Sequence, residues 1–178
     1  EDIYEDLGYE TYVLSDEDYK YFGSPKAKKG GHLKHIRGRF PATMRVLGQH
    51  YNYAENIDII IPLCYQTLLR THPVTLEYMP GLATHWKLSK DRMQMWFRIN
   101  PDARFSDGSG MTSADVVFSI LRAKQRTSDF KEYISTVSGV EAVGDYAVKI
   151  TTSKPNPILL NQLSNIFIMS KAWSEKNF

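Results

Sequence analysis

One stretch of the chain, RFSDGSGMTSADVVFSILRAK at residues 104–124, combines a carboxylate with two glycines just ahead of a helical pattern. Turns of this kind bind phosphate, ligate a metal ion or only cap the helix that follows. The stretch lacks the lysine of a phosphate-binding loop and the glycine spacing of a dinucleotide-binding loop or a nucleophile elbow. It also lacks the alternating acids and the closing glutamate of a calcium-binding loop.

The same stretch has the features of a turn followed by a capped helix. The pair Asp107–Gly108 suits a tight turn. Thr112 is a good N-cap, and Asp115 follows three residues later, which is a capping box with Asp in place of Glu or Gln. The sequence therefore predicts a structural turn and an amphipathic helix. The apolar stripe of that helix consists of Val116, Val117, Ile120 and Leu121.

Histidine and cysteine could also bind a metal ion or act in catalysis, but here their spacing indicates no site. His32 and His35 form an H-x-x-H pair, yet on a strand they would face opposite sides, with no acid or cysteine near them in sequence. Cys64 is alone, and no serine is marked as a nucleophile. We therefore predict no catalytic residue, no metal and no cofactor. The remaining histidines, His50, His72 and His85, are isolated.

The composition is that of an ordinary globular chain. Of the 178 residues, 42% are hydrophobic and 24% are charged, which is enough to form a core in one or two domains. The formal net charge of +2 gives no field that would favour nucleic acid or membrane. No apolar run approaches the length of a membrane span. No leader peptide is visible, which leaves either a cytosolic protein or a leader outside this sequence.

Charge is distributed unevenly near the N-terminus. The first nineteen residues carry eight acids and no lysine or arginine, whereas residues 20–54 carry only basic charges. Three interpretations stay open: a nucleic-acid-binding arm, an acidic segment lying against a basic surface, or two solvated faces. A breaker-rich linker, GSPKAKKGG, follows at residues 23–31.

Hydrophobic periodicity predicts a mixed α/β chain without regular βαβ alternation. The predicted order is strand, helix, hairpin, helix, hairpin, helix, strand, and no closing element is expected after residue 170. The predicted ranges are a strand at 32–40, a helix at 53–71 that must accommodate Pro62, a hairpin at 83–99, a helix from 113, a hairpin at 140–153 turning at Gly144–Asp145, and a helix leading into an apolar strand at 158–170.

Several of these segments, taken in order, resemble the solute-binding proteins of oligopeptide, dipeptide and nickel ABC transporters. The similarity covers residues 28–175, and its most specific parts are residues 79–91 and 95–120. Three loop residues depart from the family pattern, namely Phe40, Met44 and Gly110. The segments that carry the resemblance are KKGGHLKHI, FPATM, PLCYQTLLR, MPGLATHWKLSKD, MWFRINPDARFSDGSGMTSADVVFSI, VEAVGDYAVKITTSKPNPILLNQLS and IFIMSKAW.

The resemblance implies a partial periplasmic-binding-protein-like fold of class II, in which two lobes of a longer chain close over a ligand. This chain would be an N-terminal fragment that contains the small extra domain and edge pieces of the first lobe. The expected division is an acidic extension at 1–27, the first strand and loop of lobe one at 28–46, the small mixed domain at 47–165, and a return strand toward lobe one at 166–178.

The resemblance also implies a function without catalysis. The protein would capture oligopeptides or related solutes outside the cytoplasmic membrane, in the periplasm or at the cell surface, and deliver them to the permease subunits of the transporter. No nucleic acid would be bound. Two other classes stay open: a stand-alone interaction module that uses the acidic N-terminal segment, and a small enzyme. The residues expected to line the ligand cleft are Arg39, Phe40, Tyr51, Asn52, Tyr53 and Ala54.

Overall fold

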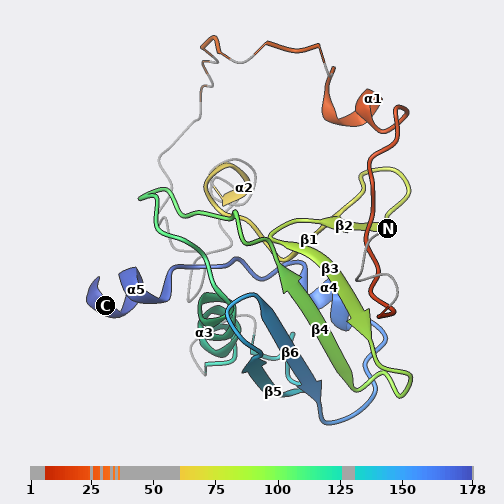
Figure 1. Ribbon diagram of the computed structural model, residues 1–178, viewed down its shortest axis with the longest axis vertical. Helices are drawn as coiled ribbons and strands as arrows, with labels where there is room; N and C mark the ends of the chain where they lie inside the picture. Colours follow the sequence, from red (N-terminus) through yellow and green to blue (C-terminus); the bar gives the residue numbers. More distant parts are fainter. Residues whose placement is uncertain are drawn as a thin grey trace.

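The computed structural model describes residues 7–24, 26–28, 30–32, 34, 36, 61–125 and 131–177. Within these residues the chain forms a four-stranded antiparallel sheet in the order β3-β4-β6-β5 and a separate two-stranded sheet, β1-β2 (Figure 1). The strands are β1 (Leu69–Thr71), β2 (Tyr78–Pro80), β3 (Ala83–Leu88), β4 (Gln94–Ile99), β5 (Val137–Ala142) and β6 (Ala147–Thr152).

One face of the four-stranded sheet carries the core. Trp86, Phe97 and Val148 are cross-strand partners in one row, and Met95 pairs with Ile150 in the next. Because side chains alternate across a strand, these residues point to the same side, where they are almost completely buried.

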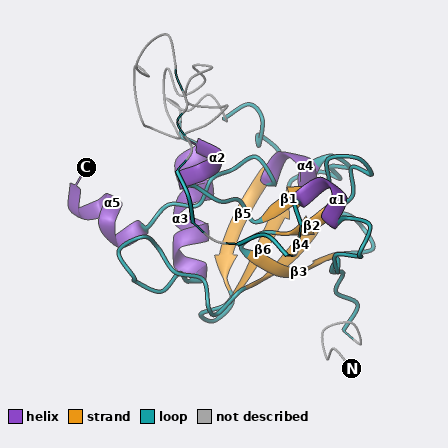
Figure 2. Ribbon diagram, turned by 90° about the horizontal axis from the view of Figure 1, so that it is seen from above, coloured by secondary structure: helices purple, strands orange, loops and turns teal. Residues whose placement is uncertain are grey.

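Five helices complete the described part. The longest, α3 (Ser113–Ala123), packs against β5 and β6 with Val116, Ile120 and Ala123 buried, and α5 contacts α3 (Figure 2). Leu121, which the sequence placed in the apolar stripe, is instead 48% exposed. Leu159 and Leu163 of α4 join the same core. The other bounds are α1 (Tyr19–Phe22), α2 (Ile61–Cys64), α4 (Leu159–Leu163) and α5 (Lys171–Asn177).

The stretch at residues 104–124 is the predicted turn and capped helix. The carboxylate of Asp107 accepts hydrogen bonds from the hydroxyl and the amide of Ser109, which lower the pKa of Asp107. Gly108 has φ = 86°, the left-handed region that favours glycine. The Thr112–Asp115 capping box is present, and the amide of Thr112 donates to Oδ2 of Asp115 at 2.9 Å.

The acidic segment packs against its own chain. Residues 7–22 are here called the N-terminal arm, and the part of the arm around Glu10 runs beside β3 (Figure 1). Glu10 and Trp86 exchange backbone hydrogen bonds, and the indole of Trp86 donates to Oε2 of Glu10 at 3.0 Å. Lys87 donates to the carbonyl of Leu7 at 2.6 Å. Glu10, one of the acids of the arm, thus contacts β3 through both its backbone and its side chain.

The two predicted hairpins and the helix from residue 113 are confirmed, with β5 starting at Val137, ahead of the predicted 140. The predicted helix at 53–71 is wrong at its end, because residues 69–71 form strand β1, which pairs with β2. The final apolar strand is reduced to one bridge, between Thr67 and Phe167.

The expectation of no closing element is also wrong, because α5 occupies residues 171–177. The hydroxyl of Ser170 accepts the amide of Trp173 at 3.2 Å, as an N-cap does. The predicted strand at 32–40 and the first part of the predicted helix at 53–71 lie mostly outside the described residues.

Candidate functional site

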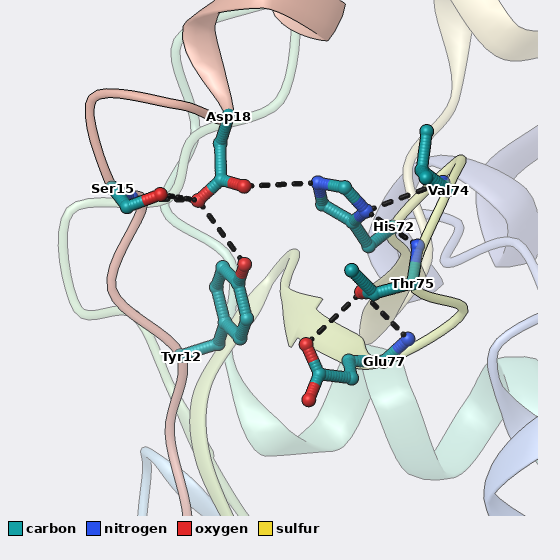
Figure 3. A network of polar contacts seen from close by, with 7 residues as sticks. All are labelled: Tyr12, Ser15, Asp18, His72, Val74, Thr75 and Glu77. Carbon is teal, nitrogen blue, oxygen red and sulfur yellow. Dashed lines mark hydrogen bonds and ion pairs between the residues drawn. The ribbon is translucent and has the colours of Figure 1, made fainter.

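All six residues expected to line the ligand cleft lie outside the described residues. These residues are Arg39, Phe40, Tyr51, Asn52, Tyr53 and Ala54. Within the described part, a cluster of polar and aromatic groups surrounds two buried side chains, Asp18 and His72, where the N-terminal arm meets the turn between β1 and β2 (Figure 3).

His72 is the centre of this cluster. It follows β1 directly, and its side chain is 1% exposed. Its Nδ1 accepts the amide hydrogens of Val74 at 3.2 Å and Thr75 at 3.0 Å, so the side chain caps the turn that leads to β2. Since Nδ1 is an acceptor, the ring proton is on Nε2. This turn also holds Leu76 at φ = 63°, a conformation that a non-glycine residue seldom adopts.

Asp18 faces the protonated nitrogen of His72 from the arm. Its Oδ1 lies 3.2 Å from Nε2, although the contact does not have hydrogen-bond geometry. Oδ2 accepts the amide of Ser15 at 2.6 Å, the hydroxyl of Ser15 at 2.8 Å and the hydroxyl of Tyr12 at 3.1 Å. The carboxylate thus joins the arm to the turn between β1 and β2 (Figure 3).

These contacts shift the ionisation of both acidic groups. The amide and then the hydroxyl of Ser15 lower the pKa of Asp18, and the hydroxyl of Tyr12 and the neighbouring His72 act in the same direction. Burial raises the pKa of Tyr12, and its hydrogen bond to the Asp18 carboxylate raises it further.

Aromatic rings surround the imidazole. The ring centroids of Tyr12, Tyr21 and Phe22 lie 6.2, 5.7 and 5.4 Å from that of His72, the last two in edge-on orientation. The guanidinium carbon of Arg70 lies 5.7 Å from the centroid of Phe22. Three rings from the arm therefore enclose a side chain of the turn.

The arrangement does not match a catalytic histidine. An acid–base histidine needs one nitrogen toward the orienting acid and the other toward the reacting group. Here the second nitrogen is occupied by the two backbone amides, and the serine in the cluster, Ser15, is bound to Asp18. No group of three metal-ligating side chains occurs among the described residues. What the cluster can do is hold two segments of the chain together.

Sequence analysis missed this cluster because it took His72 as isolated and considered Asp18 only as one member of an acidic segment. One available signal was the pattern of aromatic residues around Asp18. Tyr12 precedes it, and Tyr21 and Phe22 follow it within the span of a short helix. Such a pattern indicates that one face of the segment is covered.

We expect the Asp18→Asn substitution to change how the stability of the fold depends on pH in the acidic range. A carboxyl group whose pKa is lowered on folding stabilises the fold at pH values above its ordinary pKa of about 3.9. This contribution disappears as the pH falls through the pKa that the group has in the folded protein. Thermal unfolding should therefore show the native protein melting at a higher temperature than Asp18→Asn near neutral pH, with the gap closing below about pH 4.

The exposed neighbour Glu17 supplies the control for this experiment. Its carboxylate pairs only with the exposed Lys20 at 3.2 Å among the described residues. Glu17→Gln removes the same charge without touching the cluster, so its melting temperature should follow the native curve at every pH. The prediction would be contradicted if the difference in melting temperature between the native protein and Asp18→Asn stayed constant at pH values well below the ordinary pKa of aspartate.

A second feature of the described part is an open hollow of about 620 Å³ between α3 and α5. Val117, Phe118 and Leu121 supply its apolar wall. Arg122 also lines it and lies over the ring of Phe118. Polar side chains also line it, from Gln125 at the end of α3 and from Lys171, Ser174 and Glu175 of α5.

Comparison with known proteins identifies the family. The model for the middle part of the bacterial extracellular solute-binding proteins, family 5, matches residues 77–178, from just before β2 through α5. The chain belongs to this family. Among the described residues, none of the helices combines the length and apolar character that crossing a bilayer requires.

Relatives in the family support the same assignment. A probable peptide-binding protein, YejA of Agrobacterium fabrum, is 27% identical over 160 residues, which are 89% of this chain and 25% of YejA. NikZ of Campylobacter jejuni, solved in complex with Ni(L-His), matches with a TM-score of 0.66 and 28% identity over 77% of this chain and 27% of NikZ. AgaA of A. tumefaciens R10, solved with agropinic acid, matches with a TM-score of 0.60 and 28% identity. This match covers 64% of this chain and 24% of AgaA.

These matches confirm the resemblance and the expected fold. The mixed α/β architecture is part of a periplasmic-binding-protein-like fold, and the chain spans about a quarter of the length of the relatives it matches.

Proposed function

We propose that the native protein is the substrate-binding component of an ABC transporter, which captures oligopeptides or related solutes and delivers them to the permease subunits. The family match over residues 77–178 carries this proposal. The relative from Agrobacterium fabrum bears the name of a probable peptide-binding protein, and NikZ and AgaA were solved with small solutes bound. Capture and release alone would perform this function, so no catalytic group is required of the chain.

The proposed location is outside the cytoplasmic membrane, in the periplasm or at the cell surface as a lipoprotein. The family's description as extracellular solute-binding proteins supports it. The proposed domain division has the small mixed domain at 47–165, preceded by the acidic extension at 1–27 and the first strand and loop of lobe one at 28–46. Residues 166–178 would lead back toward lobe one.

We assign the ligand contacts of this chain to Arg39, Phe40 and the segment Tyr51–Ala54. The side-chain chemistry of these residues suits a peptide. A guanidinium pairs with a carboxylate, a tyrosine offers an apolar face with a polar tip, and an asparagine side chain both donates to and accepts from backbone amides. A peptide held in this way would use main-chain hydrogen bonds for affinity and side-chain pockets for selectivity.

The first test is to identify the solute bound to the native protein. The full-length protein, purified without denaturation, is denatured afterwards and the released small molecules are analysed by mass spectrometry. We expect a peptide or a related small solute, and the synthetic compound should rebind in titration calorimetry. A protein that releases no solute and binds none from a pool of short synthetic peptides would overturn the proposal.

The second test addresses the residues. In the full-length protein, Tyr51→Ala and Tyr53→Ala should each weaken binding of the identified solute by about tenfold or more, because a tyrosine contributes both apolar area and a hydrogen bond. Tyr146→Ala is the matched control, since Tyr146 lies in the turn between β5 and β6 and is 37% exposed. Equal affinities for all three variants would exclude Tyr51 and Tyr53 from the site.

A further inference from the structure

The N-terminal arm is attached to the rest of the domain through its own contacts, as a separate peptide would be. Glu10 pairs with Trp86, and Asp18 faces His72, so both contacts join residues that are far apart in sequence. The described residues that follow the arm, between positions 23 and 34, are all exposed. The packing of the arm thus depends on the arm itself and not on the described residues after it.

The backbone of the arm is bound by the outer edge of β3. Within the described part, β3 is an edge strand of the four-stranded sheet, with β4 on its inner side. The amide of Glu10 donates to the carbonyl of Trp86 at 2.6 Å, and the amide of Trp86 donates back at 3.0 Å. Because a strand edge presents backbone donors and acceptors, it can pair with an extended segment of the same or another chain. The edge of β3 is therefore a site for strand addition, which the arm occupies.

Side chains of β3 select the segment that pairs with this edge. The indole of Trp86 donates to Oε2 of Glu10 at 3.0 Å, which favours an acid at that position. The ammonium group of Lys87 lies 5.8 Å from the ring centroid of Tyr9, which favours an aromatic residue just ahead of the acid. This part of the site therefore fits an acidic extended segment that carries an aromatic ring.

A second part of the site lies at the turn between β1 and β2. Among the described residues, the buried Nε2 of His72 has no hydrogen bond, and the Asp18 carboxylate faces it at 3.2 Å. Rings of the arm surround the imidazole, namely Tyr12, Tyr21 and Phe22. Both parts of the site thus bind an acid beside aromatic residues. A second copy of this chain carries a segment with that pattern.

Large apolar side chains remain uncovered on both sides of the contact. On the arm, Leu7, Val13 and Leu14 are exposed, and on the turn Val74 and Leu76 are exposed. Exposed apolar side chains that gather in one region are typical of a surface that meets another molecule. In a two-fold dimer the same surface of each copy meets its counterpart, so these side chains can cover one another.

We propose that the N-terminal arm exchanges between two copies of this protein, so that each arm occupies the β3 edge and the His72 pocket of the other copy. The exchanged arm makes the same contacts as the arm in a single copy, because the same residues meet. The cost is that of bringing two copies together, so exchange increases with protein concentration. This assembly is independent of the solute that the protein binds.

Two cysteine variants of the full-length protein test the exchange. Since Glu10 and Trp86 are antiparallel partners, Thr11 lies opposite His85, and its hydroxyl donates to the carbonyl of Thr84 at 2.8 Å. Directly opposed side chains of this kind are close enough for a disulfide. Thr11→Cys and His85→Cys are made in separate copies, in which Cys64 and any other native cysteine are replaced by serine. The two proteins are mixed, oxidised and separated by electrophoresis without reductant.

The control replaces the partner on β3 with an exposed residue on the opposite edge of the sheet. Glu141 lies in β5, so Thr11→Cys mixed with Glu141→Cys can link only through random collision. We expect the mixture of Thr11→Cys and His85→Cys to form at least about tenfold more linked dimer than this control. The amount of linked dimer should increase with protein concentration. A single chain that carries both Thr11→Cys and His85→Cys should form the disulfide internally when dilute.

Three results would overturn the proposal. The first is a mixture that links no better than the control at any concentration, while the double variant closes its internal disulfide. The second is equal linking in the mixture and the control. The third is a double variant that forms no disulfide at all. If Thr11→Cys or His85→Cys does not fold, Tyr9→Cys and Lys87→Cys replace them, because these residues are in contact on the other side of Glu10.

Discussion

Replacing Gly81 with alanine should lower the free energy of unfolding by about 3 kcal/mol, because the added methyl group meets backbone that has no room to move. A Cβ at this position would lie 2.5 Å from the carbonyl oxygen of Thr67 and 2.9 Å from that of Leu68. The amides of Gly81 and Ala83 both donate to the Leu68 oxygen, at 3.2 and 2.9 Å. The clash is therefore with the hydrogen-bonded backbone that joins β3 to the segment ahead of β1.

The Thr67–Leu68 backbone cannot retreat, because it is held on its other side as well. Thr67 forms a bridge with Phe167, and the amide of Ile168 donates to the carbonyl of Gln66 at 3.0 Å. Leu68 itself is 1% exposed. A movement that relieves the clash would have to break this pairing or displace a buried leucine.

Gly139 provides the matched control. It lies in β5, and a Cβ there would lie 3.7 Å from Cβ of Thr151, which is ordinary contact. Gly139→Ala should change the free energy of unfolding by less than about 1 kcal/mol. Urea unfolding of the full-length protein, followed by tryptophan fluorescence, measures both variants. If the two variants unfolded at similar urea concentrations, the Thr67–Leu68 backbone would be able to move away from the added methyl group without loss of stability, contrary to the prediction.

Replacing Asp115 with alanine should also destabilise the fold by about 3 kcal/mol, since one carboxylate serves two helices. Oδ2 accepts the amide and the hydroxyl of Thr112, which completes the cap of α3. Oδ1 accepts the amide of Lys171 at 2.8 Å, at the first residue of α5. The side chain is buried, at 7% exposure, so the donors are left without water when it is removed.

The exposed carboxylate of Asp107 distinguishes this effect from the general loss of an acid. Within the part of the chain that the structure describes, it accepts hydrogen bonds only in its own turn, from Ser109. Asp107→Ala should therefore leave the urea midpoint almost unchanged, while Asp115→Ala lowers it and speeds amide hydrogen exchange in both α3 and α5. Faster exchange confined to α3 would mean that Asp115 acts as a cap alone.

The elements that the sequence predicts correctly are those with a complete local pattern. In β4, buried and partly exposed residues alternate along all six positions, as a strand with one covered face requires. The helix α3 has a cap, a capping-box acid and an apolar stripe within one short stretch. The wrong predictions involve short elements. Three residues of β1 are too few to show a period of two, and Leu69, together with Leu68 just ahead of the strand, continued a helical spacing.

The family, too, could be predicted from the sequence, because ordered motifs along the chain carry it. Residues 79–91 and 95–120 supply the turn, hairpin, loop and capped helix in the order that the resemblance requires. The family model confirms this over residues 77–178. The motif glycine at position 81 gains a physical explanation from the structure, in the close approach of the Thr67 carbonyl.

What the sequence alone determined about this protein is therefore its local structure and its family, since both are encoded in residues that are neighbours along the chain. Only the tertiary structure decided that Asp18 meets His72, that Asp115 joins α3 to α5, and that the acidic arm packs on β3. These contacts join residues far apart in sequence. No local pattern specifies such a pair, because its geometry depends on how the whole sheet and its turns bring the two segments together.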